Sequence, residues 1–442
     1  MRHVVKTCTI KPTILPDHHL PYAGDHDIPQ KIAWLSKEQR RCTTKVISME
    51  YSPQDAQPPV IYLNNAVTTW PKPTEVLEEV AACLRLPVNE SGRTTGIGSR
   101  DYPSAAREAL AAFFRTGPPE HIIFTQNATD SLNLLIHGFA KKTGMPFHAI
   151  TTELEHNSVL RPLTALEDEG AITLSVVPFT NNIVGLAAIK KAICPETRLV
   201  VMTHGSNVLG SVQDIRPIAE YLHANDIFFI VDGAQTAGHI PVDLSDTPVG
   251  AFVFTGHKAL YGIPGIGGFF ISEPDAIAIT RQGGTGTDSQ ELTHPFDMPM
   301  RFEAGTHNYP GIASLFAGIR FITSTGLEAI GKKNTELTRW FIRELKDIRG
   351  ITVYNENPDL PVVSFDIAGI DNHEAGFILA RAYNIIMRTG LHCAPLVHER
   401  IDGGNGCIRA SFSYFNTRDE CRKAAEAIRE VAESADSQIH SD

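Results

Sequence analysis

The chain has 442 residues, a formal net charge of −11 at pH 7 and 42% hydrophobic residues. This length allows two or three domains with a large hydrophobic core. The acidic balance, without any basic stripe, argues against nucleic acid as the main partner, because phosphate backbones are bound by clustered Lys and Arg.

Membrane insertion and secretion are not expected either. The longest apolar runs, such as 227–231, are much shorter than a membrane span. Pro12, Pro16 and Asp17 interrupt any apolar core of a signal peptide. The seven cysteines are scattered without CxxC spacing, which fits reduced thiols rather than a disulfide framework or a zinc site. We therefore predict a cytoplasmic protein that binds no metal ion.

Residues 1–58 differ from the rest of the chain. They are rich in Pro and His, show little periodicity and end in a loop-like stretch over 52–59. We interpret them as an N-terminal extension of unknown role. Five of its side chains could bind a metal ion, but their spacing matches no familiar ligand pattern, so surface packing or a lid is favoured. They are Cys8, His18, His19, His26 and Cys42.

From residue 61 onward, short apolar strands alternate with helix-length segments. Strands are predicted over 121–125, 148–151, 172–177, 199–203, 227–232, 251–254 and 267–271, and helices over 131–139, 215–224 and 312–322. Apolar strands separated by helices indicate a mostly parallel sheet that is covered on both faces. Near residue 320 the pattern changes to a smaller set of helices and strands. It ends in a capping box, Thr417 to Glu420, that opens a last helix. The fold class is therefore α/β, with a large domain over 59–318 and a smaller α/β domain over 319–442.

Polar residues follow several predicted strands, where ligands bind in such sheets. Thr129 lies at a helix start that would suit a phosphate, or it is simply an N-cap. His156 and Asn207 follow two further strands, and a lone histidine in such a place is more often structural than catalytic. Asp232 closes an apolar strand, where a carboxylate needs a cationic or donor partner. That partner could be the ring nitrogen of a pyridine cofactor, or Asp232 could cap a helix.

The stretch 251–271 places Lys258 between two apolar strands. A buried lysine is costly unless a partner takes up its charge. A desolvated lysine also loses its proton easily and condenses with an aldehyde cofactor, although a solvated turn lysine is the alternative. The glycine-rich stretches 262–268 and 283–289 match neither a Walker loop nor a dinucleotide fingerprint, which removes the two commonest nucleotide-binding motifs.

Eight segments, in order along the chain, resemble the class V, fold-type I pyridoxal-phosphate enzymes, and specifically the cysteine desulfurase and selenocysteine lyase family. The two most informative are Val231-Asp-Gly-Ala-Gln235 and Thr255-Gly-His-Lys258. The others are 61–66, 127–129, 155–156, 206–210, 302–306 and 388–393. The resemblance covers roughly 59–431 and implies a seven-stranded, mostly parallel sheet in the large domain.

The resemblance also implies roles for individual residues. Lys258 would hold pyridoxal 5'-phosphate covalently, Asp232 would face its ring nitrogen, His156 would stack on the ring, and Gln235 would hydrogen-bond its phenolate oxygen. The phosphate would be bound by Ala128, Thr129, Thr255 and His257, joined by Thr306 from the neighbouring subunit of a homodimer. The amino-acid substrate would contact Asn207, Arg388 and Arg409, with Arg409 binding its carboxylate through two parallel hydrogen bonds.

Cys393 then decides the chemistry. The resemblance implies that its thiolate takes the sulfur of cysteine as a persulfide, leaves alanine, and passes the sulfur to an acceptor protein. His392 or Arg388 would favour the thiolate, whereas a buried, inert cysteine is the alternative reading. Two further functions stay open: a lyase for selenocysteine or another β-substituted amino acid, and a sulfur-relay protein with a vestigial site.

Three positions depart from the family pattern. Asn64 stands where the family usually carries Asp, and Val67 stands where it carries Ala. The segment 90–98 lacks a histidine that is common there, so we assign no substrate contacts to it.

Overall fold

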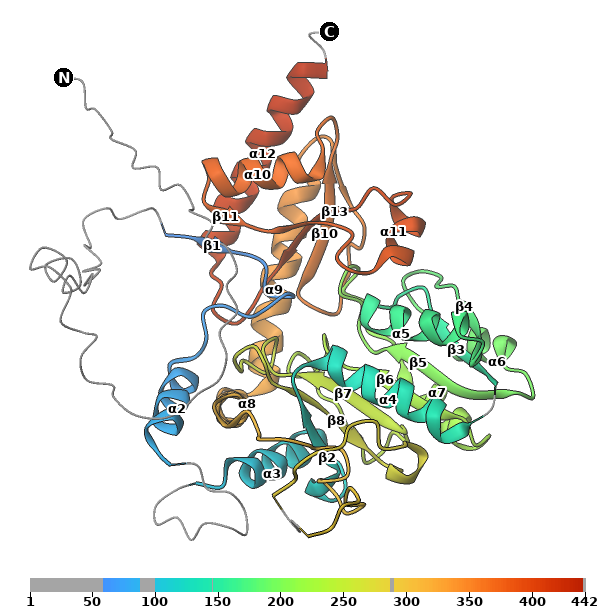
Figure 1. The fold of residues 1–442 in the computed structure, drawn as a ribbon. Helices are drawn as coiled ribbons and strands as arrows, with labels where there is room; N and C mark the ends of the chain where they lie inside the picture. The colour runs from blue at the N-terminus through green and yellow to red at the C-terminus, as the bar shows by residue number, and fades with distance from the viewer. Residues whose placement is uncertain (1–58, 88–99, 145, 287–289, 440–442) are drawn as a thin grey trace, which may run out of the picture. The chain divides into compact units, whose positions relative to one another are not determined.

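The computed structural model describes residues 59–87, 100–144, 146–286 and 290–439 (Figure 1). The predicted extension 1–58 with its candidate metal ligands and the segment 90–98 lie outside the described residues. Pro58–Asp442 form one compact unit, to which all elements below belong. Within the described residues, no helix is both long and apolar enough to cross a membrane.

A seven-stranded sheet forms the centre of the larger part of this unit. Its strands are β2 (Ile122–Thr125), β3 (Phe147–Thr152), β4 (Ile172–Val177), β5 (Thr197–Thr203), β6 (Phe228–Asp232), β7 (Ala251–Thr255) and β8 (Gly267–Ile271). They lie in the order β2-β8-β7-β6-β5-β3-β4, and β8 alone runs antiparallel to its neighbours. The predicted α/β fold with a mostly parallel seven-stranded sheet is confirmed. The bounds of β4 and β8 match the prediction, and the other strands differ by one or two residues at an end.

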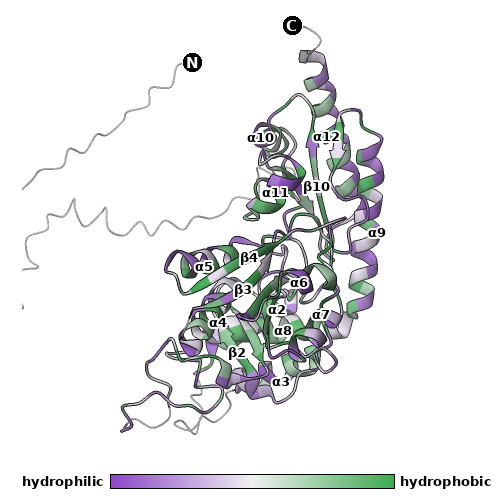
Figure 2. Cartoon of the chain, turned by 90° about the vertical axis from the view of Figure 1, so that its right-hand side faces the viewer, coloured by the Kyte–Doolittle hydropathy of each residue, from purple (hydrophilic) through white to green (hydrophobic). Residues whose placement is uncertain are grey.

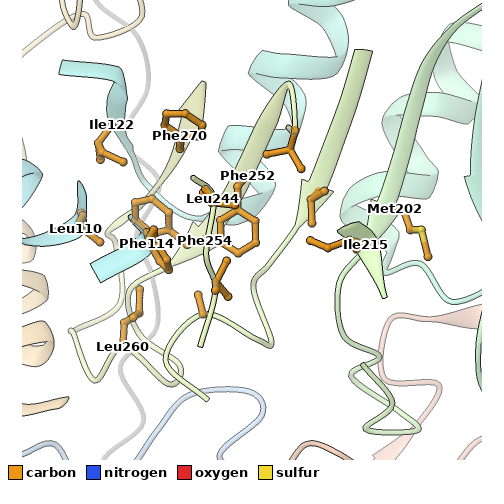
Figure 3. Close-up of a cluster of buried hydrophobic side chains, with 14 of the residues drawn as sticks. Leu110, Phe114, Ile122, Met202, Ile215, Leu244, Phe252, Phe254, Leu260 and Phe270 are labelled. Carbon is orange, nitrogen blue, oxygen red and sulfur yellow. The ribbon is translucent and has the colours of Figure 1, made fainter. Parts of the chain in front are cut away.

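Helices cover both faces of this sheet. They are α3 (Tyr102–Phe114), α4 (Ala128–Thr143), α5 (Asn157–Asp168), α6 (Leu186–Ala192), α7 (Ile215–His223) and α8 (Tyr309–Thr325), and α2 (Thr74–Arg85) packs against α8. Alternate residues of β7 point to opposite faces: Phe252 and Phe254 join a core with α3 and α8, and Val253 joins a core with α4 and α5. Figure 3 shows the first core, in which the Phe114 ring lies 5.4 Å from that of Phe252 and 5.6 Å from that of Phe254.

A second, antiparallel sheet is built from the C-terminal residues. It contains β9 (Ile351–Val353), β10 (Val362–Ile367), β12 (Arg388–Gly390) and β13 (Cys407–Ser411) in the order β12-β13-β10-β9. The helices of this region are α9 (Leu327–Lys346), α10 (Asn372–Ala382), α11 (Pro395–Ile401) and α12 (Arg418–Ile439). Figure 2 shows hydrophilic and hydrophobic residues interleaved along α9, as expected for a helix with one buried face. That face contributes Phe341 to a third core, with Phe365 of β10 and Ile428 of α12.

Two sets of contacts hold the first strand and the start of the last helix in place. The short strand β1 (Ile61–Tyr62) pairs in parallel with β11 (Ile385–Ile386), and Ile61 packs in the third core. The predicted capping box is confirmed: the Glu420 N–H donates to Thr417 Oγ1 at 3.2 Å, and the Thr417 N–H donates to Glu420 Oε2 at 2.8 Å. The predicted domain boundary near residue 318 stays a prediction.

Candidate active site

A cleft of about 250 Å³ lies where β5, β6 and β7 end. All predicted site residues except Cys393 and Thr306 line it. The lining residues are Ala66, Val67, Asn127, Ala128, Thr129, His156, Ser158, Thr203, Gly205, Asn207, Asp232, Ala234, Gln235, Thr255, His257, Lys258, Arg388 and Arg409. The parallel strands bring residues from distant parts of the sequence together, because their carboxyl ends share one edge of the sheet.

Lys258 and Asp232 reach this cleft from neighbouring strands. Asp232 is the last residue of β6 and pairs with Val253 of β7, and Lys258 follows the end of β7 by three residues. Burial lowers the pKa of Lys258 to about 8, although the nearby Asp232 works in the opposite direction. Burial raises the pKa of Asp232, whose Oδ1 accepts a hydrogen bond from the Ala234 N–H at 2.9 Å. The site therefore holds an amine that releases its proton readily beside a buried carboxyl group.

His156 precedes α5 and caps its N-terminus. The Ser158 N–H donates to Nδ1 of His156 at 3.1 Å, so Nδ1 is an acceptor and any proton on the neutral ring is at Nε2. Burial, together with the cationic Lys258 and Arg388, lowers the pKa of His156 to about 3. His156 is therefore a neutral ring held in one orientation at the wall of the cleft.

One end of the cleft is suited to an anion. Ala128 and Thr129 open α4, whose first N–H groups have no partner within the helix. Thr129 Oγ1 lies 2.7 Å from the Ser158 hydroxyl. The Thr255 hydroxyl and Nδ1 of His257 are buried without a hydrogen-bond partner. Unpaired buried polar atoms are costly, and together at a helix start they favour a bound phosphate-like group.

Two arginines that line the cleft face each other on paired strands. Arg388 of β12 is paired directly with Arg409 of β13. Arg409 is 1% exposed, and its Nη1 donates to the Asn207 carbonyl at 2.8 Å. Its Nε and Nη2 are buried without a partner. Burial lowers the pKa of Arg409 to about 9, so it remains charged at neutral pH. Two like charges opposite each other destabilise a sheet unless an anion lies between or beside them, which indicates a carboxylate-binding site.

Cys393 lies next to this arginine pair. Its Sγ accepts a hydrogen bond from Nη2 of Arg388 at 3.1 Å. Its carbonyl accepts from the Asn157 N–H at 2.7 Å, and the preceding carbonyl, of His392, accepts from the Asn207 amide at 2.8 Å. Cys393 and His392 both have positive φ angles, of 60° and 49°. Such angles are uncommon outside glycine, and strained backbone of this kind clusters at functional sites.

Three predicted residues have further contacts or positions that bear on their expected roles. Asn207 lines the cleft, but its amide nitrogen is engaged by the Cys393 loop. Gln235 donates from Nε2 to the Ala66 carbonyl at 3.1 Å, which leaves its second amide hydrogen for a ligand. Thr306 lines a different cavity, of about 670 Å³, together with Glu303 and His307. Within this single chain it does not join the cleft.

Two residues that sequence reasoning did not single out hold the Lys258 loop. Lys72 Nζ donates to the His257 carbonyl at 2.8 Å, and the Thr69 hydroxyl donates to the Lys258 carbonyl at 2.7 Å. Two residues that depart from the family pattern, Asn64 and Val67, precede Thr69 in the same segment. Val67 lines the cleft, and Asn64 Oδ1 is buried without a hydrogen-bond partner. The sequence held one signal for the hydrogen bonds of Thr69 and Lys72 to the Lys258 loop: both residues follow closely on the 61–66 motif.

Comparisons with known proteins agree with this geometry. The family model described as aminotransferase class-V matches residues 61–423. A "Probable cysteine desulfurase" of Methanothermobacter thermautotrophicus is 30% identical over 386 residues, covering 84% of this chain and 94% of the relative. A "Cysteine desulfurase" of Cronobacter sakazakii is 31% identical over 399 residues, covering 87% and 96%. Among solved structures, the apo cysteine desulfurase from Thermococcus onnurineus NA1 is similar with a TM-score of 0.76 at 28% identity, covering 85% of this chain and 95% of that one. The chain therefore belongs to the aminotransferase class-V family, as its motifs predicted.

Proposed function

We propose that this protein is a pyridoxal-phosphate-dependent cysteine desulfurase, which converts L-cysteine to L-alanine and holds the released sulfur as a persulfide on Cys393. The observation that carries the proposal is the position of the Cys393 sulfur. It lies 3.1 Å from a guanidinium nitrogen of Arg388, and Arg388 lines the same cleft as Lys258 and Asp232. The relatives described above as cysteine desulfurases agree with it.

The residues of the cleft fit pyridoxal phosphate at three separate places. Lys258 offers an amine whose pKa burial lowers to about 8, suited to covalent capture of an aldehyde. Asp232 offers a buried carboxyl group for a ring nitrogen. The helix start at Thr129 and the unpaired atoms of Thr255 and His257 offer donors for a phosphate. When bound, this cofactor supplies an aldehyde for the amino acid and a ring that stores the electron pair released as the Cα–H bond breaks.

The chain's own groups then have distinct tasks. Arg409 binds the substrate carboxylate through Nε and Nη2, the two guanidinium nitrogens without a protein partner. With the cofactor bound, Asp232 would keep a proton at the ring nitrogen, and the neutral imidazole of His156 would contact the ring. The amine of Lys258 would take the α proton of the substrate and return a proton during product formation.

Cys393 acts on the sulfur of the substrate. As a thiolate it forms an S–S bond with the substrate sulfur, and the bond between that sulfur and the β carbon breaks. The electron pair left at the β carbon takes up a proton, which gives the methyl group of alanine. Arg388 orients the Cys393 sulfur through its hydrogen bond, and the two carbonyl contacts of residues 392 and 393 hold the loop in place.

Alanine release tests this proposal. The wild-type protein is expected to form alanine from cysteine in the absence of added thiol, and Cys393→Ala is expected to lose most of that activity. Cys194→Ala is the matched control, because Cys194 is also partly exposed and does not line the cleft. Equal alanine formation by the Cys393→Ala variant and the control would exclude the persulfide role. A comparison of kcat/KM for cysteine, selenocysteine and other β-substituted amino acids distinguishes a desulfurase from a lyase.

We also propose a homodimer in which Thr306 reaches the cleft of the partner subunit. Two observations support it: Thr306 does not line the cleft of its own chain, and Leu292 and Phe296 in the same segment are 98% and 70% exposed. Such exposed apolar side chains favour an interface. Mixing an inactive Lys258→Ala protein with a Thr306→Val protein tests the arrangement. Mixed dimers would contain one intact site, so activity above that of either variant alone is expected; no gain after subunit exchange would contradict it.

The remaining predictions concern the surroundings of the enzyme. We propose that a sulfur-acceptor protein receives the persulfide of Cys393, and that the enzyme works in the cytoplasm. Its described cysteines, Cys83, Cys194, Cys393, Cys407 and Cys421, are all free thiols, which supports a reducing compartment.

We further propose that residues 1–58 form an extension distinct from the large domain at 59–318 and the small domain at 319–442. Persulfide transfer by a protein that lacks the extension tests whether this segment takes part.

A further inference from the structure

Three metal-binding side chains meet beside the Cys393 loop but outside the cleft. His392 precedes Cys393, His398 lies in α11, and Cys407 begins β13. One donor atom from each lies within 4.8 Å of the other two. Nε2 of His392 is 3.4 Å from Sγ of Cys407, and the two imidazole rings are 5.4 Å apart. The three residues are 2%, 0% and 0% exposed. They are called the His392–His398–Cys407 cluster below.

The hydrogen bonding within the cluster is incomplete. Nδ1 of His398 lies 2.5 Å from the buried carboxylate of Asp402, which leaves Nε2 as the nitrogen available to a ligand. That Nε2 and the Nδ1 of His392 are both buried without a partner. Metal-binding histidines typically donate their second ring nitrogen to a carboxylate, which fixes the tautomer and the ring orientation. The Asp402–His398 contact has this form.

Charge and ligand number decide which ion fits. Two imidazoles and one thiolate suit soft d10 ions, namely Cu(I) and Zn(II). Structural zinc takes four ligands, whereas the described residues offer three. Arg409 lies two residues beyond Cys407 on the same face of β13, and Arg388 is paired with it. A metal ion binds cysteine as the thiolate, so binding displaces the proton of the buried Cys407 thiol. A monovalent ion then leaves the local charge unchanged, but a divalent ion adds a positive charge beside two guanidinium groups.

We propose that His392, His398 and Cys407 form a binding site for Cu(I), with Asp402 orienting His398. Binding forms a bond between the ion and the Cys407 sulfur and releases the thiol proton to solvent, without any change of oxidation state. Because His392 directly precedes Cys393, the ion would link the Cys393 loop to α11 and β13. The cysteine spacing predicted no metal site, since these donors come from three elements and only one is a cysteine.

Anaerobic competition for Cu(I) against bicinchoninate tests the proposal. The full-length holoenzyme with Cys393→Ser is the background, so that the thiol in the cleft does not compete. One Cu(I) per chain is expected at the cluster. Adding Cys407→Ser should weaken its binding at least 100-fold, and Asp402→Asn should weaken it about 10- to 100-fold. Cys421→Ser removes another buried cysteine that is not part of the cluster and should have no effect.

X-ray absorption at the copper edge of the unmutated holoenzyme loaded with Cu(I) provides a test that does not depend on the folding of a variant. Two nitrogen ligands and one sulfur ligand are expected. Equal Cu(I) affinity in the Cys407→Ser and Cys421→Ser proteins would overturn the site. A spectrum with sulfur ligands only would overturn it as well. Binding of Zn(II) but not Cu(I), with the same dependence on Cys407, would overturn the choice of ion. None of these results depends on the desulfurase activity.

Discussion

Replacing Arg409 with Met tests the carboxylate-binding role most sharply. The guanidinium offers two unpaired nitrogens, Nε and Nη2. Each charge-assisted hydrogen bond to a carboxylate contributes about 1.5–3 kcal/mol, so losing both removes about 3–6 kcal/mol of substrate binding. At about 1.4 kcal/mol for each factor of ten, kcat/KM for cysteine should fall by roughly 10² to 10⁴.

Stability should respond very differently to the same change. Met leaves the Asn207 carbonyl without its donor at 2.8 Å, which costs about 1–3 kcal/mol. It also removes two buried, unpaired donor atoms and a charge directly opposite Arg388, and both changes favour folding. These terms oppose each other. The free energy of unfolding should therefore change by less than about 2 kcal/mol, as expected where a strained site serves function rather than stability.

The assay is alanine formation over a range of cysteine concentrations, with the cofactor absorbance recorded on the same sample. Arg400→Met is the matched control, because its side chain is 51% exposed on α11 and it does not line the cleft. Most of the loss in the Arg409 variant is expected to appear as a raised KM, with the cofactor still bound. A kcat/KM within threefold of the wild-type value would refute the carboxylate role.

Three further predictions concern the cofactor side of the cleft. Covalent reconstitution of the apoprotein with pyridoxal phosphate should accelerate as pH rises from 7 to 9. Burial lowers the pKa of Lys258 to about 8, and only the neutral amine, about a tenth of the total at pH 7, condenses with the aldehyde. A rate of absorbance change that does not vary with pH would contradict this. His156→Asn keeps a side chain that caps α5, so the melting temperature should stay within a few degrees while alanine formation falls about 100-fold or more; unchanged turnover would remove the ring contact from the mechanism. Gly233→Ala places a Cβ 2.1 Å from the Phe252 ring, which should cost about 1–3 kcal/mol or more of unfolding free energy. Gly117→Ala, where nothing lies within 4 Å, is its control, and equal denaturant midpoints for the two variants would show that the turn after β6 adapts.

Much of the fold was accessible from local patterns in the sequence. β4 and β8 are short apolar runs bounded by turn residues, and both were predicted to the residue. The predicted helix over 131–139 instead extends to Ala128–Thr143. Its ends depend on the Asn127 cap and on Gly144, whose φ is 68°, and the apolar periodicity alone does not reveal either.

The site residues also include some that local sequence patterns predict and some that they do not. His156, Asp232 and Lys258 follow apolar strands, so their place at one sheet edge follows from the parallel topology. The contact of Lys72 with His257 could not be predicted, because it joins segments 185 residues apart whose paths meet only in the fold. Asp402 and His398 are four residues apart at the end of α11, so their contact is local, but the sequence alone does not show that α11 ends there. The pairing of Arg388 with Arg409 likewise depends on the register of β12 and β13, which the sequence of two such short strands leaves open.

The sulfur carried by Cys393 is the central claim, and mass spectrometry of the protein after treatment with L-cysteine tests it most directly. The account predicts one added sulfur on the peptide that contains residue 393, formed together with alanine and absent from a Lys258→Ala protein treated in the same way. Alanine formation by the wild-type enzyme with no added sulfur on that peptide, under conditions that preserve persulfides, would contradict it.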